Sequence, residues 1–313
     1  MRILVSGSLA YDRIMNFQGV FSEHIVPEKV HTLNVSFMVE DMKESFGGNA
    51  GNISYNLALL GQTAAPVSTA GKDFGPYQDW LSTRGVDTSL IQIDTSLPTA
   101  FASILTDQKD NQITAFYPGA MKKPYVFSKE MFGEKCIGII APGNPDDMRE
   151  LAKLFRVNEI TFVYDPGQQI PVLSGDDLKA GMEKAGALVS NDYELAMIMK
   201  KTNWNENQIL EHVEMIVTTL GEKGSHIRTR KEVIDVPAAK PKNTSDPTGA
   251  GDAYRAGLLY GFLHEWPLDI CGKFAGVIAC YTIESYGTQT HHFSFDEARL
   301  RYEENFKELL PTQ

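Results

Sequence analysis

An alternation of apolar and amphipathic segments, which begins near residue 137, constrains the fold of this chain more than any other feature. The apolar runs are short and rich in residues that favour strands, and they lie at residues 137–141, 160–164 and 187–190. Amphipathic stretches separate them at residues 146–157 and 176–185. Repeated strand–helix units give this pattern and build a parallel sheet covered by helices. We therefore predict an α/β fold.

The remaining regular elements are predicted on both sides of this region. Further strands are expected at residues 2–7, 65–70 and 215–220. The last third of the chain differs, because three helical segments rich in Ala and Gly follow one another at residues 249–264, 267–286 and 294–308.

Two segments do not fit the alternation, residues 11–40 and 98–117. The second has the pattern of a hairpin, with strands at 101–106 and 112–117 around a turn at 107–111. We expect both segments to form antiparallel strands outside the main sheet, as a small β-sheet lid over the ligand site. No Pro- or Ser-rich linker divides the remaining residues, which would form one α/β domain from residues 1–10, 41–97 and 118–313.

The charge and composition exclude several functions. The chain has 313 residues and a net charge of -11, which argues against nucleic-acid binding, because that binding depends on clustered Lys and Arg. No apolar run approaches the roughly 20 residues of a membrane span, and residues 1–7 have the pattern of a buried strand rather than a signal peptide. The three cysteines are scattered without metal-ligand spacing. We therefore expect a cytoplasmic protein without nucleic-acid or membrane partners.

The most specific motif is a glycine turn that leads into an apolar helical run, Ser245-Asp-Pro-Thr-Gly-Ala-Gly-Asp252. It directs the N–H groups of Gly249, Ala250 and Gly251 at whatever lies above the helix N-terminus, where an anion is stabilised. Asp252 lies in the first helical turn and would face a bound phosphate. This arrangement suits phosphoryl transfer, with N–H donors for the transferring group and a carboxylate that accepts the proton of the attacking hydroxyl. A capped helix with a glycine turn is the structural alternative.

Two familiar nucleotide-binding motifs are missing from the sequence. Tyr254 stands where the dinucleotide fingerprint Gly-x-Gly-x-x-Gly requires its third glycine. Residues 221–225 lack the spacing of a P-loop. A nucleotide would therefore bind in a different way.

Polar residues near the first strand and near a second glycine turn are candidates for holding the acceptor molecule. Gly48 precedes a helical pattern and lets the backbone approach a ligand, while Asn49 and Asn52 supply amides that suit hydroxyl groups. Asp12 lies just past the first strand, at the carboxyl end where ligands bind in an open α/β sheet, and its carboxylate could hold a diol. Asn49 as a helix N-cap and Asp12 as a turn residue are the alternatives.

Two further segments follow predicted strands and are candidates for the nucleotide side. Asn191 and Glu194 offer oxygen ligands to Mg²⁺ or its waters, although a helix N-cap explains both nearly as well. Thr219, Gly221 and Gly224 form a glycine turn that suits backbone contact with ATP phosphates, with a plain β-turn as the alternative.

These motifs occur in the order found in the ribokinase-like (PfkB) sugar and nucleoside kinases, which the chain resembles from residue 4 to about residue 290. The resemblance implies a three-layer α/β/α sandwich with a mostly parallel central sheet, in which the main domain is the kinase domain and a β-sheet forms the lid. It also implies Mg-ATP as the phosphoryl donor and a primary hydroxymethyl group as the acceptor.

The resemblance assigns roles to the candidate residues by position. Asp252 resembles the catalytic base, and residues 249–251 resemble the anion hole. The remaining assignments are Asp12, Gly48 and Asn52 to the sugar, Asn191 with Glu194 to Mg²⁺ and phosphate, and Thr219, Gly221 and Gly224 to ATP. Thr248 is a further candidate ATP contact. With Asp246 and the turn at 285–289, it also occupies the region that binds a monovalent cation such as K⁺ in some relatives.

Within that family the chain looks most similar to prokaryotic adenosine and broad-specificity nucleoside kinases, through residues 111–121 and the Tyr254–Arg255 pair. The predicted lid also supplies aromatic rings that could stack on a purine, whereas packing inside the lid is their alternative role. The candidate substrate contacts in the lid are Gln112, Phe116 and Phe37.

The leading hypothesis is therefore a kinase that phosphorylates the 5′-hydroxyl of a nucleoside, with adenosine favoured and Asp252 as the base. A sugar kinase of the ribokinase or fructokinase type is the first alternative, and a non-catalytic nucleoside-binding protein is the second. The expected partners are ATP and a small nucleoside or sugar, and the apolar edge of the lid leaves a homodimer open.

Overall fold

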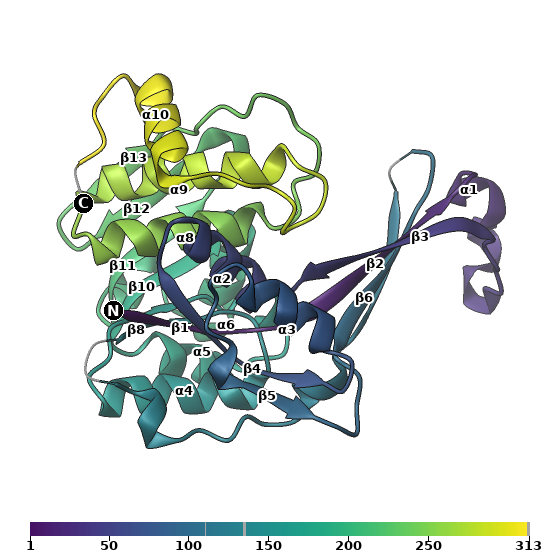
Figure 1. The fold of residues 1–313 in the computed structure, drawn as a ribbon, viewed down its shortest axis with the longest axis horizontal. Coiled ribbons are helices and arrows are strands. Elements are labelled where there is room, and N and C mark those ends of the chain that lie inside the picture. The colour runs from purple at the N-terminus through teal and green to yellow at the C-terminus, as the bar shows by residue number, and fades with distance from the viewer. Residues whose placement is uncertain (110, 134–135, 312–313) are drawn as a thin grey trace.

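The computed structural model of the chain describes residues 1–109, 111–133 and 136–311 and confirms the predicted mostly parallel α/β sandwich (Figure 1). Within these residues the main sheet has nine strands in the order β13-β12-β11-β10-β9-β8-β1-β4-β5. The strands are β1 (Arg2–Ser6), β4 (Thr63–Gly71), β5 (Ile91–Asp94), β8 (Cys136–Ile140), β9 (Phe162–Tyr164), β10 (Ala185–Asn191), β11 (Val213–Thr219), β12 (Ser225–Thr229) and β13 (Val233–Val236). All neighbours are parallel except β12, which runs antiparallel to β11 and β13.

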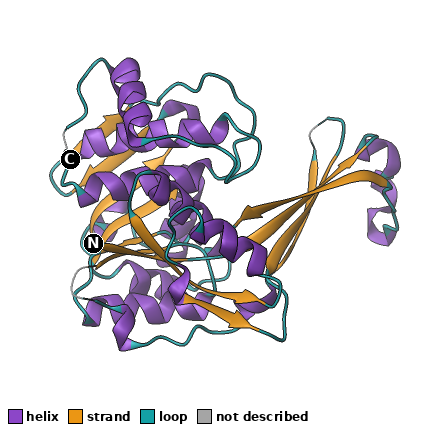
Figure 2. Cartoon of the chain, in the orientation of Figure 1, coloured by secondary structure: helices purple, strands orange, loops and turns teal. Residues whose placement is uncertain are grey.

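Helices cover both faces of this sheet (Figure 2). One layer consists of α2 (Asn49–Leu59), α3 (Gly75–Ser82), α8 (Ala250–Leu263), α9 (Leu268–Ile283) and α10 (Phe295–Phe306), and the other of α4 (Pro145–Val157), α5 (Gly175–Met182), α6 (Asp192–Thr202) and α7 (Glu206–Ile209). Successive side chains of a strand point to opposite faces, so Ile3 and Val5 of β1 join the first core and Leu4 joins the second. No helix in the described part of the chain is both long and apolar enough to cross a bilayer.

The short helical turns connect these elements. They are the single-turn helix α1 (Phe21–His24) and the 3-10 turns η1 (Pro27–Thr32), η2 (Thr88–Leu90), η3 (Gly119–Lys122), η4 (Lys129–Met131), η5 (Gly167–Gln169) and η6 (Gly221–Lys223).

A second, four-stranded sheet projects from the main body as an arm and corresponds to the predicted lid (Figure 1). Its strands are β3 (Val39–Gly47), β2 (Ala10–Phe17), β6 (Ala100–Thr106) and β7 (Gln112–Tyr117), in that order across the sheet. The predicted hairpin is present as β6 and β7, and its turn at 107–111 includes residue 110, which lies outside the described residues.

The lid differs from its prediction in two respects. Residues 41–47 belong to β3 and pair with β2, although the sequence assigned them to the main domain. Most of β3 is exposed on both faces, so it lacks the apolar alternation by which a half-buried strand is recognised. In addition, β2 and β6 pair in parallel rather than antiparallel, because both strands leave the main body and run outward.

Candidate active site

A cavity between the lid and the main domain lies at the carboxyl end of β1, with β4 and β8 on either side of that strand. The strand order reverses at β1, and ligands of open α/β sheets bind at such a point. This space is here called the lid cavity. Predicted site residues from separate parts of the chain line it: Asp12, Gly48, Asn49, Asn52, Phe116, Thr248, Gly249 and Asp252.

Asp252 is buried in the floor of the lid cavity, with 6% of its surface exposed. Two amides from the first turn of α2 hold its carboxylate: Asn49 Nδ2 donates to Oδ1 at 2.8 Å, and Asn52 Nδ2 donates to Oδ2 at 2.8 Å. Gly48 precedes α2 with φ of +87°, and a Cβ there would lie 2.6 Å from the carbonyl oxygen of Ser8. The glycine turn therefore brings the start of α2 against the segment that follows β1.

Burial raises the pKa of Asp252, whereas the charge of Arg255 and the two amide donors act in the opposite direction. Arg255 lies one helical turn further along α8 and forms a bidentate ion pair with Asp165. Burial works against the charge of Arg255, but Asp165 outweighs it and leaves the pKa of Arg255 raised. The guanidinium is thus a permanent positive charge next to the buried Asp252 carboxylate.

Asp165 was missed by the sequence analysis, and only 1% of its surface is exposed. It follows β9 directly, and the next residues form the Pro166-Gly167 turn, with Gln168 and Gln169 lining the lid cavity. The signal that singled out Asp12, a carboxylate just past a buried strand, applies equally to Asp165.

Asp12 lies on β2 and faces the lid cavity. Burial, together with the nearby carboxylates of Asp252 and Asp246, raises its pKa to about 6. A Cβ at Gly47, on the neighbouring strand β3, would overlap the Asp12 carboxylate. The first glycine of the Gly47–Gly48 pair therefore makes room for the Asp12 side chain.

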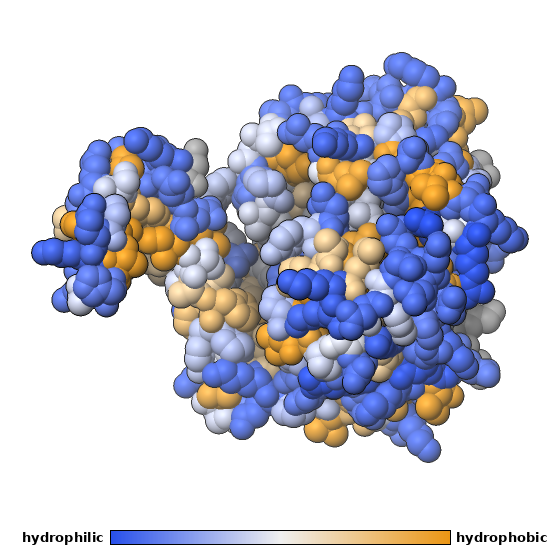
Figure 3. All heavy atoms as spheres, turned by 180° about the vertical axis from the view of Figure 1, so that it is seen from behind, coloured by the Kyte–Doolittle hydropathy of each residue, from blue (hydrophilic) through white to orange (hydrophobic). Residues whose placement is uncertain are grey.

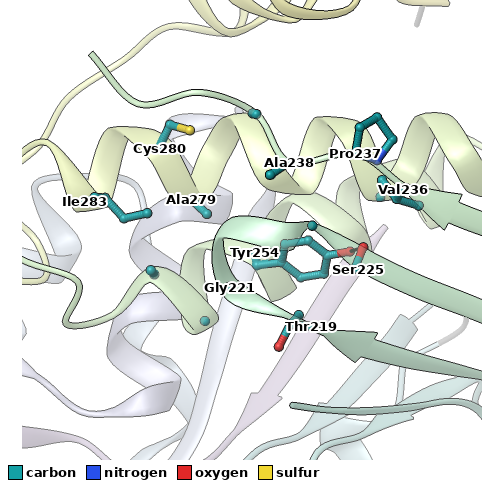
Figure 4. Close-up of a pocket in the computed structure, with 16 residues that line it drawn as sticks. Thr219, Gly221, Ser225, Val236, Pro237, Ala238, Tyr254, Ala279, Cys280 and Ile283 are labelled. Atoms are coloured by element: carbon teal, nitrogen blue, oxygen red, sulfur yellow. Dashed lines mark hydrogen bonds between the residues drawn. The ribbon is translucent and has the colours of Figure 1, made fainter. Parts of the chain in front are cut away.

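A second cavity, here called the α9 cavity, lies on the other side of the α8 N-terminus (Figure 4). Residues of α9 form one wall, including Ala279, Cys280 and Ile283, and the segment 236–238 forms another. The predicted nucleotide residues Thr219, Gly221 and Gly224 line this cavity, together with Ala250 and Gly251. Small residues predominate among those that line it, and most of the lining is apolar.

The first turn of α8 separates the two cavities. Gly249 and Asp252 line the lid cavity, whereas Ala250 and Gly251 line the α9 cavity. Gly249 adopts φ of +79° at the helix start, and the Ala250 N–H donates to the Pro247 carbonyl at 3.2 Å. Ala250 is therefore engaged within the turn, in contrast to the predicted set of three N–H groups open to a ligand.

Thr248, Asn191 and Glu194 are not among the residues that line the α9 cavity. Thr248 faces the lid cavity instead. Asn191 and Glu194 form a capping box at the start of α6, in which each side chain accepts the backbone N–H of the other, at 2.8 and 2.9 Å. Glu194 also acts electrostatically on Asp165 and Arg255, which places its charge near the buried ion pair.

Of the three candidate substrate contacts in the lid, one lines the lid cavity and two do not. Phe116 lines the lid cavity with 50% of its surface exposed. Phe37 packs instead against Phe17 and Phe21, with ring centroids 4.9 and 5.1 Å apart. Gln112 is an exposed residue at the start of β7 and does not line the cavity.

Gly224→Ala is expected to destabilise the fold by about 2 kcal/mol or more, because φ of +92° with ψ of -134° is almost confined to glycine. A Cβ there would also overlap the carbonyl oxygen of Val236. Val236 itself lines the α9 cavity. Gly221→Ala is the matched control, since its φ is +59° and a Cβ would meet nothing within 4 Å. Thermal melts of both variants test this, and an equal loss of stability in the two would contradict it.

The sequence of the chain matches the family described as pfkB family carbohydrate kinase over residues 6–293. The chain belongs to the pfkB family. As a pfkB kinase it is a phosphotransferase that acts on a hydroxyl group. The glycine turn at the start of α8 and the buried Asp252 lie within the matched residues.

Similar proteins cover nearly the whole of this pfkB kinase. A nucleoside kinase of Methanocaldococcus jannaschii is 30% identical over 306 residues, which is 97% of each chain. The structure of a Burkholderia thailandensis nucleoside kinase in complex with inosine is 35% identical, with a TM-score of 0.86 over 98% of this chain and 99% of that one. The same kinase in complex with ADP-inosine has a TM-score of 0.84 at 35% identity, over 99% of this chain and 98% of that one.

Proposed function

We propose that the protein transfers the γ-phosphoryl group of ATP to the 5′-hydroxyl of a nucleoside, with adenosine as the favoured acceptor. One observation carries the proposal: the first turn of α8, which holds Asp252, separates two cavities that could contain the acceptor and the donor. The nucleoside kinases of M. jannaschii and B. thailandensis support the choice of a nucleoside over a free sugar. We also propose a cytoplasmic location for the protein, which agrees with the use of ATP as the phosphoryl donor.

Asp252 is proposed as the base, because its carboxylate is buried at the boundary between the two cavities. It accepts the proton of the 5′-hydroxyl while the hydroxyl oxygen forms a bond to the γ-phosphorus, and the bond from that phosphorus to the bridging oxygen of ADP breaks. The N–H groups of Gly249 and Gly251, at the positive end of α8, stabilise the charge on the transferring group. Asp12 holds the ribose hydroxyls on the opposite wall.

The side chains present fit a magnesium ion that is held mainly by nucleotide phosphates and water. Among residues 1–109, 111–133 and 136–311, no group of three or more His, Cys, Asp or Glu side chains could cage a metal, and Mg²⁺ commonly keeps several waters and substrate phosphates as ligands. Asn191 and Glu194 would hold such waters. When bound, the ion neutralises negative charge on the phosphates. A monovalent cation such as K⁺ would bind where the loop at 285–289 meets Asp246, whose Oδ2 accepts the Gly287 N–H at 3.1 Å.

The lid is proposed to close over the acceptor and exclude water. Exposed apolar residues lie in the segment between β2 and β3 and on strands β3 and β7, namely Val26, Val30, Leu33, Met38, Met42 and Ile113. Figure 3 shows hydrophobic residues on the surface of the arm in orange. An exposed apolar set of this kind is typical of an association surface, and we propose a homodimer through the lid. Light scattering coupled to gel filtration tests this, with Met42→Lys expected to shift the mass to that of a monomer.

A panel of acceptors tests the proposed function. ATP turnover should be measured with adenosine, inosine, cytidine, ribose and fructose, and the kcat/KM ratios compared. We expect nucleosides to exceed free sugars, with adenosine first. A preference for ribose or fructose would support the sugar kinase alternative, and nucleoside binding without turnover would support a non-catalytic binding protein.

Phe116→Ala is expected to raise KM for nucleosides by about tenfold, since stacking of a base on an aromatic ring contributes roughly 1 to 3 kcal/mol. Turnover of a free sugar, which has no base, should change little. Ile113→Ala is the matched control, because Ile113 lies on the same strand with a similar exposure but does not line the lid cavity. Equal effects of Phe116→Ala on nucleosides and sugars would contradict a stacking role.

A further inference from the structure

Gln289 lies in the loop after α9, with 2% of its surface exposed, and its amide joins three side chains beside the lid cavity. Its Nε2 donates to Asn52 Oδ1 at 3.0 Å and to Tyr77 Oη at 2.5 Å. Its Oε1 accepts the indole N–H of Trp80 at 3.1 Å. The amide of Gln289 is therefore fully engaged in a buried network that includes Asn52, one of the two residues that contact Asp252.

A fixed donor at one end of this network and a fixed acceptor at the other determine how the amides of Gln289 and Asn52 are oriented. The indole N–H of Trp80 can only donate, so Gln289 must turn its oxygen toward Trp80 and its nitrogen toward Asn52. Asn52 must then present its oxygen to Gln289 and its nitrogen to the cavity floor. At the other end, the ionised carboxylate of Asp252 can only accept, which requires the same orientation of Asn52.

We propose that Gln289 is a positioning residue that locks the amide of Asn52 so that its nitrogen always faces Asp252. Without Gln289 the amide of Asn52 could rotate by a half-turn whenever Asp252 is protonated, and its oxygen would then accept the carboxyl proton. In that orientation Asn52 no longer donates to Asp252, and the protonated form of Asp252 is stabilised at the expense of the ionised form. The inference rests on the proposed role of Asp252 as the base.

The packing around Gln289 depends on a glycine in the first turn of α2. A Cβ at Gly51, between Asn49 and Asn52 on α2, would overlap the hydroxyl of Tyr77 and lie 3.1 Å from Gln289 Nε2. Glycine at this position therefore leaves the room in which the network forms. The Tyr77 hydroxyl in turn donates to the carbonyl oxygen of Gly47 at 2.9 Å, so the network also reaches the last residue of lid strand β3.

Gln289→Met tests the proposal, because methionine has a similar length and its thioether accepts only weakly from Trp80. We expect kcat to fall by about tenfold and the acid limb of the kcat profile to move up by about one pH unit, since a donor to ionised Asp252 is lost. KM for ATP should change little. A lower Tm with kcat and the acid limb unchanged would show a purely structural role and overturn the proposal.

The matched control is Tyr55→Phe, which removes a buried hydrogen bond in the same layer, from the Tyr55 hydroxyl to the carbonyl oxygen of His291 at 2.5 Å. This variant should lower Tm without moving the acid limb. Asp252 interacts electrostatically with four charged or titratable groups, Arg255, Asp12, Asp165 and Tyr77. Both variants keep all of these groups, so a difference between their profiles reports the orientation of Asn52.

A double-mutant cycle separates action through Asn52 from action by another route. In an Asn52→Leu background, Gln289→Met should cost no further activity, because the amide that it positions is gone. An equal loss in both backgrounds would overturn the proposal. If Asp252→Asn itself retained activity, the proposed base would be wrong, and that outcome is measured without any change at Gln289.

Discussion

Asp252→Asn is expected to lower kcat by about 10³-fold, because it removes the carboxylate that we propose accepts the proton of the attacking hydroxyl. Binding of ATP and nucleoside should persist within a few-fold, since Asn has the same shape and retains one oxygen to accept from Asn49 or Asn52. Steady-state kinetics and calorimetric titrations of the purified variant measure the two effects separately.

Asp147→Asn provides a control matched in chemistry. Asp147 is also buried, and burial raises its pKa to about 6, but it lies at the start of α4 and accepts the backbone N–H of Tyr125 at 2.7 Å. Asn at this position can keep that hydrogen bond, so turnover should be close to that of the unmodified protein. Near-normal turnover in a folded Asp252→Asn variant would refute its role as the base.

Asp12→Asn is expected to weaken nucleoside binding by about 10- to 100-fold, because hydrogen bonds to a charged group contribute roughly 1.5 to 3 kcal/mol. The same change should stabilise the protein at neutral pH. Asp12 has a pKa of about 6 in the folded chain and an ordinary value of 3.8, since burial and the carboxylates of Asp252 and Asp246 oppose its ionisation.

The pH dependence of this gain in stability follows from the difference between the pKa of Asp12 in the folded chain and its ordinary pKa. Because the folded-state pKa is raised, ionised Asp12 lowers stability, and this penalty is absent below the ordinary pKa, grows as pH rises to about 6 and is constant above it. The Tm difference between Asp12→Asn and the unmodified protein should therefore be small at low pH and positive at neutral pH. A variant that bound nucleoside normally, or that was less stable only at neutral pH, would contradict this account.

Much of the site could be predicted from sequence because its residues lie in short glycine-containing segments. The turn at Gly249 and the pair Gly47–Gly48 are local features, and the structure shows the backbone angle or close approach that requires glycine at each. The rule that ligands bind at the carboxyl ends of parallel strands located Asp12 in the same way.

The remaining features depend on contacts between distant segments. The ion pair of Asp165 with Arg255 joins the end of β9 to α8, and the bond from Gln289 to Asn52 joins a loop after α9 to α2. Neither has a local pattern. Phe37 illustrates the opposite error, because an aromatic residue in the lid suggests stacking on a ligand, yet its ring packs against Phe17 and Phe21 in the arm. Composition cannot distinguish these two environments.

The most direct test of the proposed function is to compare a nucleoside with its 5′-deoxy analogue as acceptor for ATP, using mass spectrometry and phosphorus NMR to identify the product. We expect adenosine to give adenosine 5′-monophosphate and ADP in equal amounts, and 5′-deoxyadenosine to give neither. Asp252→Asn should form product from adenosine about 10³-fold more slowly and none from 5′-deoxyadenosine. Phosphorylation of 5′-deoxyadenosine, or ADP formation with free ribose that exceeds the rate with every nucleoside, would contradict the account.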